Sequence, residues 1–243
     1  NLMSKQTDLI NVTDAITVSG SNVGIGTSSP SFEAGSGGGL EVNYSAGLGS
    51  HIKLTDSASG AGGSNGFDLY AFNTSGYIEN YEAGSIIFRN GGDQRMAIDS
   101  SGRVTMPYQP YFAAEMNGVN NYVSSGADTN LPFNSAPYNV GGHFNASTYR
   151  FTAPVTGKYA MAVGVINDVS SPVGRFMFYV NNSADGNGVK WGINGSSTAG
   201  GGSTTASAVI WLNANDYVEV RSQSGAIVNY QGNHSSWTGI LVS

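Results

Sequence analysis

The apolar residues of this chain do not recur at the spacing of a helix. No window of about eleven residues carries a clear apolar stripe at positions i, i+3, i+4 and i+7, which is the pattern of an amphipathic helix. Short aromatic and β-branched runs alternate instead with turns rich in serine, asparagine and glycine, and glycine alone contributes 35 of the 243 residues. Because many short strands joined by tight turns produce this pattern, the sequence predicts an all-β protein.

Charge and cysteine content argue against several classes of protein. The formal net charge is −6, and no basic cluster interrupts the chain, so we expect no nucleic-acid partner. No apolar run approaches the length of a membrane span, so we expect no membrane insertion. The absence of cysteine removes disulfides and thiolate-bound zinc, and it favours a bacterial or viral source. No signal peptide is recognised at the start, and because the chain opens with Asn1 rather than methionine we expect a fragment or a processed product.

A strand, a tight turn and a second strand are predicted for residues 149–166. Aromatic and β-branched residues fill 149–152, while Pro154 and Gly157 bracket the reversal. Residues 159–166 then form an almost unbroken apolar run without helix caps. We therefore expect a strand that is packed on both faces or that lies at a seam between subunits.

Four motifs in the second half of the chain resemble the C1q/TNF-like domain family. They are Phe-Thr-Ala-Pro-x-x-Gly-x-Tyr at 151–159, Leu-Pro-Phe-Asn at 131–134 with Phe-Asn at 144–145, Leu-Asn-Ala-Asn-Asp-x-Val-x-Val at 212–220, and Trp-Thr-Gly-Ile-Leu at 237–241. Asn215 stands where the family usually has glycine, and asparagine is the next-best residue for a positive φ. The resemblance covers about residues 107–243, and it implies a ten-stranded jelly-roll sandwich that assembles as a homotrimer.

Residues 15–106 resemble modules of bacteriophage tail fibres and related trimeric surface fibres. The motifs are Asn-Val-Gly-Ile-Gly-Thr-Ser-Ser-Pro at 22–30, followed by a Leu-x-Val strand, and Gly-x-Ile-x-Phe, a turn, then Arg-Met-x-Ile-Asp-x-x-Gly-x-Val across 84–104. Residues 99–102 are predicted to form a hairpin turn in which Gly102 has a positive φ. The short strands predicted here mostly alternate apolar and polar residues, and no helix is predicted to cover their apolar faces. Three chains wrapped together, as in a triangular β-prism, would cover them.

A proline-rich segment separates two expected domains. Pro107 and Pro110 each restrict their own backbone and that of the preceding residue, so the segment is expected to be a stiff hinge. We expect a trimeric β-rich fibre shaft at residues 1–106 and a jelly-roll tip at residues 107–243. The apolar residues expected at the seams between subunits are Phe88, Ile98, Tyr159, Met161 and Val163.

Catalysis is not expected, so the chain is predicted not to be an enzyme. No Gly-x-Ser-x-Gly elbow supports a serine hydrolase, and the three histidines lie far apart. The acidic residues that could pair as in a glycosidase are Glu79 with Glu82 and Asp93 with Asp99. Glycosidases of fibre type need a long solenoid and a cleft, which this shaft is too short to build. A polysaccharide depolymerase remains the alternative that this chemistry leaves open.

Calcium is the one cofactor that the sequence brings into consideration. Asp168 and Asp185, together with loop carbonyls around Asn181 and Asn182, could form an oxygen cage. The resemblance implies the same chemistry, because some relatives bind calcium at the top of the trimer. No EF-hand spacing supports the cage, and solvated loop acids explain both residues more simply. We therefore expect no cofactor, with calcium as the alternative.

Aromatic residues in polar loops are the candidates for binding a glycan or receptor. A sugar needs a ring on which its C–H face can stack and amides that bond its hydroxyls, and residues 190–194 and 230–234 each supply both. The candidate binding residues are Tyr230, Gln231, Asn233, His234, Trp191 and Asn194. The alternative for Trp191 is a buried position in a strand, which is also the position expected for Trp237.

These features together predict the distal end of a trimeric viral fibre, either a phage tail fibre or a head fibre of the virion. Its jelly roll would bind a host cell-surface polysaccharide or an outer-membrane receptor, and three identical tips would raise a weak affinity by avidity. Other virion proteins would attach through the N-terminal side. The alternative is a structural capsid or appendage decoration that binds no receptor.

Overall fold

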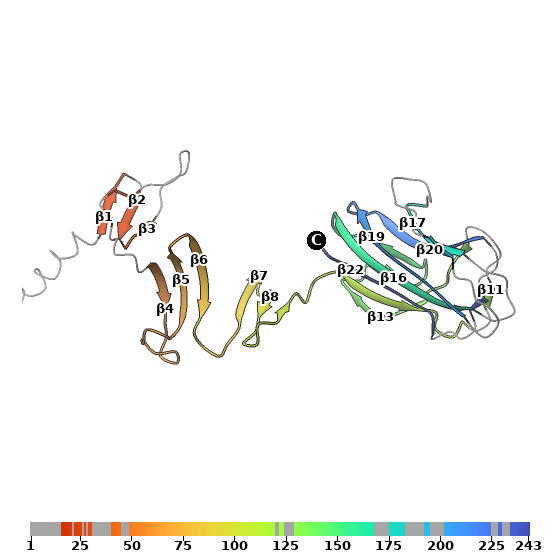
Figure 1. Cartoon of the computed structure of the whole chain (residues 1–243), viewed down its shortest axis with the longest axis horizontal. Coiled ribbons are helices and arrows are strands. Elements are labelled where there is room, and N and C mark those ends of the chain that lie inside the picture. Colours follow the sequence, from red (N-terminus) through yellow and green to blue (C-terminus); the bar gives the residue numbers. More distant parts are fainter. Residues whose placement is uncertain are drawn as a thin grey trace, which may run out of the picture. The chain divides into compact units, whose positions relative to one another are not determined.

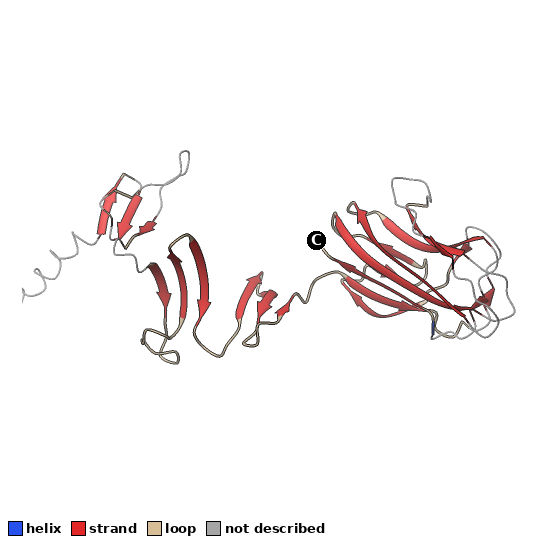
Figure 2. Cartoon of the chain, viewed as in Figure 1, coloured by secondary structure: helices blue, strands red, loops and turns tan. Residues whose placement is uncertain are grey.

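The computed structural model describes residues 16–20, 22–25, 27, 29–30, 40–44, 49–119, 122–123, 129–167, 175–182, 192–194, 202–224, 228–229 and 234–243. The regular secondary structure of these residues consists of β-strands, as Figure 2 shows, so the prediction of an all-β fold is confirmed. The chain divides into two compact units, Asn1–Met106 and Pro107–Ser243 (Figure 1). Within the part of the chain described, no helix is long and apolar enough to cross a membrane.

Three sheets of three strands make up the described part of the first unit. Their strands are β1 (Ile16–Ser19), β2 (Asn22–Ile25) and β3 (Leu40–Val42); β4 (Ser50–Leu54), β5 (Phe67–Phe72) and β6 (Ser75–Asn80); and β7 (Ile86–Asn90), β8 (Asp93–Ile98) and β9 (Val104–Thr105). Neighbouring strands are antiparallel except β2 and β3, which are parallel.

The second and third of these sheets each leave an apolar face exposed in the single chain. Ile52, Leu69 and Ile78 are partners across β4, β5 and β6, and all three side chains are exposed. In the third sheet Phe88 pairs with Met96, and Phe88 is also exposed. Because residues of a strand alternate between faces, Ile52, Leu69 and Ile78 share one face of the second sheet, and Phe88 and Met96 share one face of the third.

The opposite face of the second sheet carries a stack of aromatic rings. His51, Tyr70 and Tyr77 are partners on three adjacent strands, and their ring centroids lie 4.7 and 4.5 Å apart. The side chain of Asp68 on the same face lies 2.7 Å from Nδ1 of His51, and Tyr70 donates a hydrogen bond of 2.9 Å to Glu79. Cross-strand pairs of this kind fix the register of a small sheet.

The second unit is a sandwich of two sheets. The seven-stranded sheet contains β10 (Tyr111–Glu115), β11 (Tyr122–Val123), β13 (Ser135–Val140), β16 (Gly157–Asn167), β19 (Gly202–Leu212), β21 (Val228–Asn229) and β22 (Ser236–Leu241). The six-stranded sheet contains β12 (Thr129–Asn130), β14 (Phe144–Asn145), β15 (Arg150–Thr152), β17 (Arg175–Val180), β18 (Gly192–Asn194) and β20 (Tyr217–Ser224). Strand β16 pairs along its whole length with β19 on one side, and it pairs with β22 and β21 on the other.

Aromatic side chains from both sheets form the core of the sandwich. Trp237 on β22 is fully buried, and its ring meets Phe112 edge to face at 5.0 Å. Phe133, Phe144 and Phe178 also surround the indole. Edge-to-face pairs of this kind add to the stabilisation that comes from burying apolar area. The expectation that Trp237 is a buried strand residue is confirmed.

Strand β16 corrects the prediction of the subunit seam. Tyr159, Met161 and Val163 are buried in the core of the single chain, so the prediction that they lie at a seam between subunits is wrong for Tyr159 and Val163, whereas Met161 also lines the outer groove described below. The reason is the alternation of the strand, which turns these three residues into the core and their neighbours Ala160 and Ala162 to the outer face. Phe88 and Ile98, in the first unit, are not buried, and their place at a seam stays a prediction.

Two predicted turns have the backbone that their residues favour. Asn215 has a φ of 74°, and its N–H donates to the carbonyl of Ala153 over 2.8 Å. Gly102 has a φ of 78°, which closes the turn between β8 and β9. Both residues occupy the left-handed region that asparagine and glycine tolerate best, as predicted.

Candidate functional site

The chain enters the sandwich at one of its two ends, next to the last residues of the domain. The N–H of Leu241 donates to the carbonyl of Pro110 over 3.0 Å, and the N–H of Lys158 donates to the carbonyl of Ser243 over 2.7 Å. The first residues of the domain, its last residues and the start of β16 therefore lie together. We call this the entry end.

The strands that flank the candidate binding loops finish at the opposite end. Strand β16 runs from the entry end to Asn167, which pairs with Asn229 on β21. Strand β20 likewise starts at the entry end, and its last residue, Ser224, pairs with Arg175 on β17, which in turn pairs with Asn194 on β18. The register thus gathers these strand ends at one place, which we call the loop end.

Two of the predicted binding residues can be placed there. Asn194 ends β18 at the loop end. His234 is exposed and directly precedes Ser235, whose hydroxyl accepts a hydrogen bond from the N–H of Ile166 near the end of β16. The other predicted residues lie outside the described residues: Tyr230, Gln231, Asn233 and Trp191, and the calcium candidates Asp168 and Asp185.

A second candidate site is an apolar groove on the outer face of the seven-stranded sheet. The groove has a volume of about 660 Å³ and no charged residue lines it. Its lining includes Tyr111, Ala160, Ala162, Val209, Thr238 and Ile240. Val209 is 56% exposed in the single chain, and the side chains of Ile240 and nearby Trp211 are exposed too. An exposed apolar surface of this kind suits contact with another macromolecule or with an apolar ligand.

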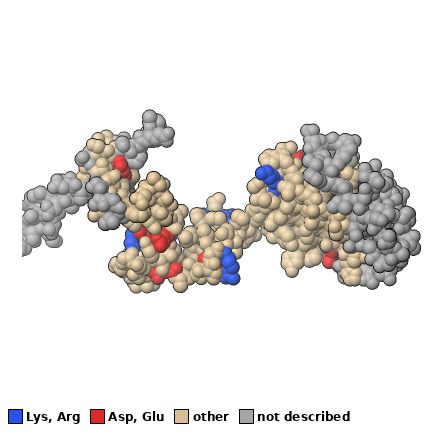
Figure 3. All heavy atoms as spheres, in the orientation of Figure 1, with Lys and Arg blue, Asp and Glu red and all other residues tan. Residues whose placement is uncertain are grey.

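The surface is otherwise sparsely charged. On the face drawn in Figure 3, the described lysines and arginines form small separate groups, some of them next to acidic residues. Most charged side chains of the six-stranded sheet instead belong to one compact cluster, described next.

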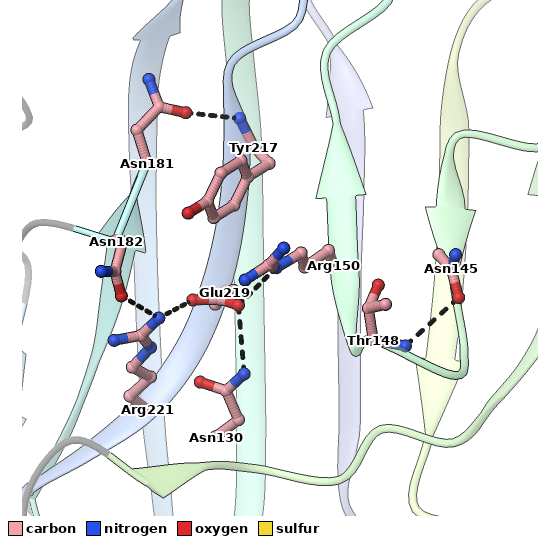
Figure 4. Close-up of polar contacts among 9 residues, drawn as sticks. All are labelled: Asn130, Asn145, Thr148, Arg150, Asn181, Asn182, Tyr217, Glu219 and Arg221. Atoms are coloured by element: carbon pink, nitrogen blue, oxygen red, sulfur yellow. Dashed lines mark hydrogen bonds and ion pairs between the residues drawn. The ribbon is translucent and has the colours of Figure 1, made fainter.

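A carboxylate surrounded by two arginines forms the third candidate site, on the six-stranded sheet (Figure 4). Glu219 on β20 is fully buried, although Val218 and Val220 are the residues of this strand that face the core. Arg150 donates from Nε to one carboxylate oxygen of Glu219 over 2.6 Å, and Arg221 donates from Nη2 to the other oxygen. The amide of the Asn130 side chain donates a third bond, of 3.1 Å.

Each arginine of this cluster also lies over a tyrosine ring. The guanidinium carbon of Arg150 is 4.3 Å from the centroid of Tyr217, and that of Arg221 is 5.0 Å from the centroid of Tyr179. Arg221 donates a further bond of 2.6 Å to the side-chain oxygen of Asn182. Cation–π contacts and bonds to a carboxylate together restrict a guanidinium to one orientation.

The charges in this cluster are fixed by their neighbours. Burial alone would raise the pKa of Glu219, but the hydrogen bonds from Arg150, Arg221 and Asn130 outweigh burial and hold the pKa below its ordinary value. The hydrogen bond to Glu219 raises the pKa of Arg150. The cluster therefore contains two cations and one anion at neutral pH, which leaves one net positive charge.

The sequence contains a pattern that indicates this cluster, although none of the predictions above included it. The run Val218-Glu219-Val220-Arg221 alternates valines with opposite charges, which places the charged pair on one face of a strand. A solvated outer face is the ordinary interpretation of that pattern. Only the pairing of β15 with β20 shows that Arg150 lies beside Glu219, so that the three charged side chains form one cluster around a buried carboxylate.

A comparison with models of known protein families finds a match for this unit. The sequence model of the C1q domain matches residues 112–242. The globular domain of the zebrafish complement 1qA protein is 18% identical, with 56% of this chain and 98% of that chain covered and a TM-score of 0.44. The TNF protein Eiger from S. frugiperda is 16% identical, with 56% of this chain and 93% of that chain covered and a TM-score of 0.45. Among curated proteins, none matches the chain.

Proposed function

Because the chain belongs to the C1q domain family, we propose that it is the distal part of a trimeric viral fibre whose jelly-roll tip binds the surface of a host cell, through a glycan. The fibre part of this proposal rests on the resemblance of residues 15–106 to fibre modules. The tip part rests on the fold of residues 107–243 and on where that fold puts its loops.

The apolar groove is the main observation that supports the proposed trimer. Domains of this family typically form homotrimers, and the groove on the seven-stranded sheet gives this chain an uncharged surface through which copies can pack. Complete burial of a side chain such as Val209 or Ile240 contributes about 1.5–3 kcal/mol. Three copies repeat each such contact, so the seam can stabilise a chain that has no disulfide.

The position of the loop end supports a role in binding. It lies at the end of the sandwich opposite Pro110, where the chain enters the domain, so a fibre attached at the entry end would present the loop end outward. The strands that end there belong to a rigid sandwich, and loops that follow such a frame are a common means of recognition. Three weak sites on one fibre would bind a cell surface by avidity.

The exposed apolar faces of the first unit support a trimeric shaft. Ile52, Leu69 and Ile78 on one sheet, and Phe88 on the next, would each be covered if three chains packed these faces together. A small sheet with one uncovered apolar face is marginally stable alone. We propose that the shaft sheets fold fully only in the trimer.

Adhesion without catalysis is part of the proposal. The carboxylates of the first unit that could pair as in a glycosidase accept hydrogen bonds from other groups. Glu79 accepts from Tyr70, and Glu82 accepts from the N–H of Gly66. Asp93 and Asp99 likewise pair with Arg95 and Arg103. Side chains that fix strands and turns in this way support a structural role for these acids. Release of reducing sugar from a host polysaccharide would contradict it.

The native mass of the protein tests the assembly. Light scattering on the full chain, and on residues 107–243 alone, should give three times the mass of one chain, which is 25.1 kDa for the full length. A folded monomer in both experiments would overturn the trimer and with it the fibre.

Binding to host cells tests the role of the tip. Replacing Tyr230 or Trp191 with alanine should reduce the binding of the trimer to cells. The matched control is Tyr108→Ala, which removes an exposed tyrosine near the entry of the domain. If the loop variants and the control all bind as the unaltered protein does, the structural decoration would be the better explanation.

A further inference from the structure

We propose that the cluster of Arg150, Glu219 and Arg221 binds the carboxylate of an acidic saccharide, with Arg150 as the group that contacts it. This site is separate from the loop end. It depends on the fold of the second unit alone, and so it stands whether or not the chain is part of a fibre.

The charge of the cluster favours an anion. Glu219 neutralises one of the two guanidinium groups, and it is fully buried between them. One positive charge is left without a carboxylate among the described partners of the cluster. Asp216, the acid directly before β20, is engaged elsewhere, since it accepts from the N–H of Asn213 and from the side chain of Asn181. An anion from solution would complete the charge balance.

Arg150 has the donors that a carboxylate needs. Only its Nε is used by Glu219, and within the part of the chain that the structure describes its two terminal nitrogens have no hydrogen-bond partner. Its side chain is 39% exposed, so these nitrogens can be reached from solution. A guanidinium presents parallel N–H groups that match the two oxygens of a carboxylate.

The guanidinium of Arg150 is already held in place. Its bond to Glu219 and its position over the ring of Tyr217 fix its plane before any ligand arrives (Figure 4). Binding therefore costs little of the rotamer entropy that a free surface arginine would lose. An arginine that served only to neutralise Glu219 would need neither the stacking nor the exposed terminal nitrogens.

The second arginine shows that the cluster has more donors than acceptors. Nε of Arg221 is buried and has no partner among the described residues. Buried donors are normally bonded, so an unbonded one indicates a missing acceptor, such as an oxygen of a ligand or a water that bridges to it.

Polar groups around the arginines suit the rest of a sugar. The side-chain amides of Asn130 and Asn182 flank the cluster and contact Glu219 and Arg221, respectively. Amides both donate and accept, which is what ring hydroxyls require. The ring of Tyr217 adds a partly exposed flat surface next to Arg150. A carboxylate-bearing sugar such as a uronic acid uses all of these groups, whereas a neutral sugar leaves the charge unmatched.

Titration of the full chain with three probes tests this proposal. Binding of D-glucuronate, D-glucose and acetate would be followed by calorimetry at low ionic strength. We expect D-glucuronate to bind saturably, and D-glucose and acetate each to bind at least about tenfold more weakly, because one lacks the charge and the other the hydroxyls. Equal binding of glucose and glucuronate would overturn the role of the charge. Equal binding of acetate and glucuronate would overturn the saccharide.

Variants of Arg150 locate the site. Arg150→Gln should weaken D-glucuronate binding about tenfold, and Arg150→Lys should weaken it nearly as much, because lysine keeps the charge but not the paired donors. The matched control is Arg103→Gln, since Arg103 also donates from Nε to a carboxylate, that of Asp99, at 2.7 Å. Binding unchanged in both Arg150 variants, or weakened equally in the control, would overturn the proposal.

Two further readouts separate this proposal from others. Thermal unfolding of Arg150→Gln shows whether the domain still folds, which we expect because Glu219 keeps its bonds from Arg221 and Asn130. If Arg150→Gln proves unfolded, the D-glucuronate binding of Arg150→Lys is the measurement that tests the proposal. The native mass of the variants should equal that of the unaltered chain, so a failure of the saccharide site is distinguishable from a failure of the trimer.

Discussion

The ring of Phe112 fills the space that a side chain at Gly239 would need. The two residues are partners on β10 and β22, and a Cβ built on Gly239 would overlap two carbons of the phenyl ring. Phe112 is fully buried and also packs on Trp237, Phe144 and Phe151. The glycine of the Trp-Thr-Gly-Ile-Leu motif is therefore a packing requirement of the core.

Gly239→Ala should lower the free energy of unfolding by about 1–3 kcal/mol, because the added methyl group forces the ring out of its position. Chemical denaturation of the purified protein would measure the change. The matched control is Gly164→Ala, on the neighbouring strand β16, where an added Cβ would meet only Thr205 at an ordinary 3.7 Å. Equal stability of the two variants would contradict the packing argument.

Val209→Asp should convert the trimer to a monomer. The substitution places an unpaired carboxylate in the apolar groove of each copy, and burial of an unpaired charge costs several kcal/mol. Light scattering on the full chain would measure the mass. Val155→Asp is the control, because Val155 is exposed but lies outside the groove, and it should remain a trimer. A trimer of Val209→Asp would show that the groove is not the interface.

The sequence was sufficient to predict the fold class and the C1q-like domain, because turn and core residues act locally. Asn215 and Gly102 have the positive φ that their turns require, and Trp237 is buried as its motif implied. The face of a strand was harder to assign. In the apolar run of β16, both Tyr159 and Ala160 look suitable for a seam, and only the pairing of β16 within the sandwich shows which of them faces the core.

The charged cluster could not be predicted, because it depends on contacts between distant parts of the chain. Arg150 and Glu219 are 69 positions apart, and Asn130 and Glu219 are 89 apart. Spacing along the sequence carries no information about such a contact. The predicted glycan-binding residues were found from sequence composition, without any structural contact to support them. Of their side chains, only that of His234 lies within the part that the structure describes.

The stability of the second unit should decrease in acid because of Glu219. Its pKa is below the ordinary value of 4.5 in the folded chain, so the unfolded chain binds the proton more readily. The stabilisation is therefore complete above about pH 4.5 and is lost as the pH falls through the lower folded pKa. Thermal unfolding followed from about pH 6 to about pH 3 would measure this loss.

Glu219→Gln provides the comparison for that acid titration. It should lower the stability at neutral pH by about 3 kcal/mol, because Arg150 and Arg221 lose the carboxylate between them. It should also make the unfolding temperature depend less on pH in the acid range, since the titrating group is gone. An unaltered pH dependence in this variant would assign the acid sensitivity to other carboxylates.

Tyr70 should be among the last tyrosines to ionise. Its hydroxyl donates to Glu79 over 2.9 Å, and this hydrogen bond raises the pKa of Tyr70 to about 12 from 10.0. The neutral form is favoured in the folded chain, so its stabilising effect is present below pH 10.0 and is lost as the pH rises toward about 12. The difference in ultraviolet absorbance between the unaltered chain and Tyr70→Phe would isolate this phenol. Glu79→Gln removes the charge of the acceptor and should return the pKa of Tyr70 toward 10.0, and a difference titration already centred at 10.0 in the unaltered chain would contradict the bond.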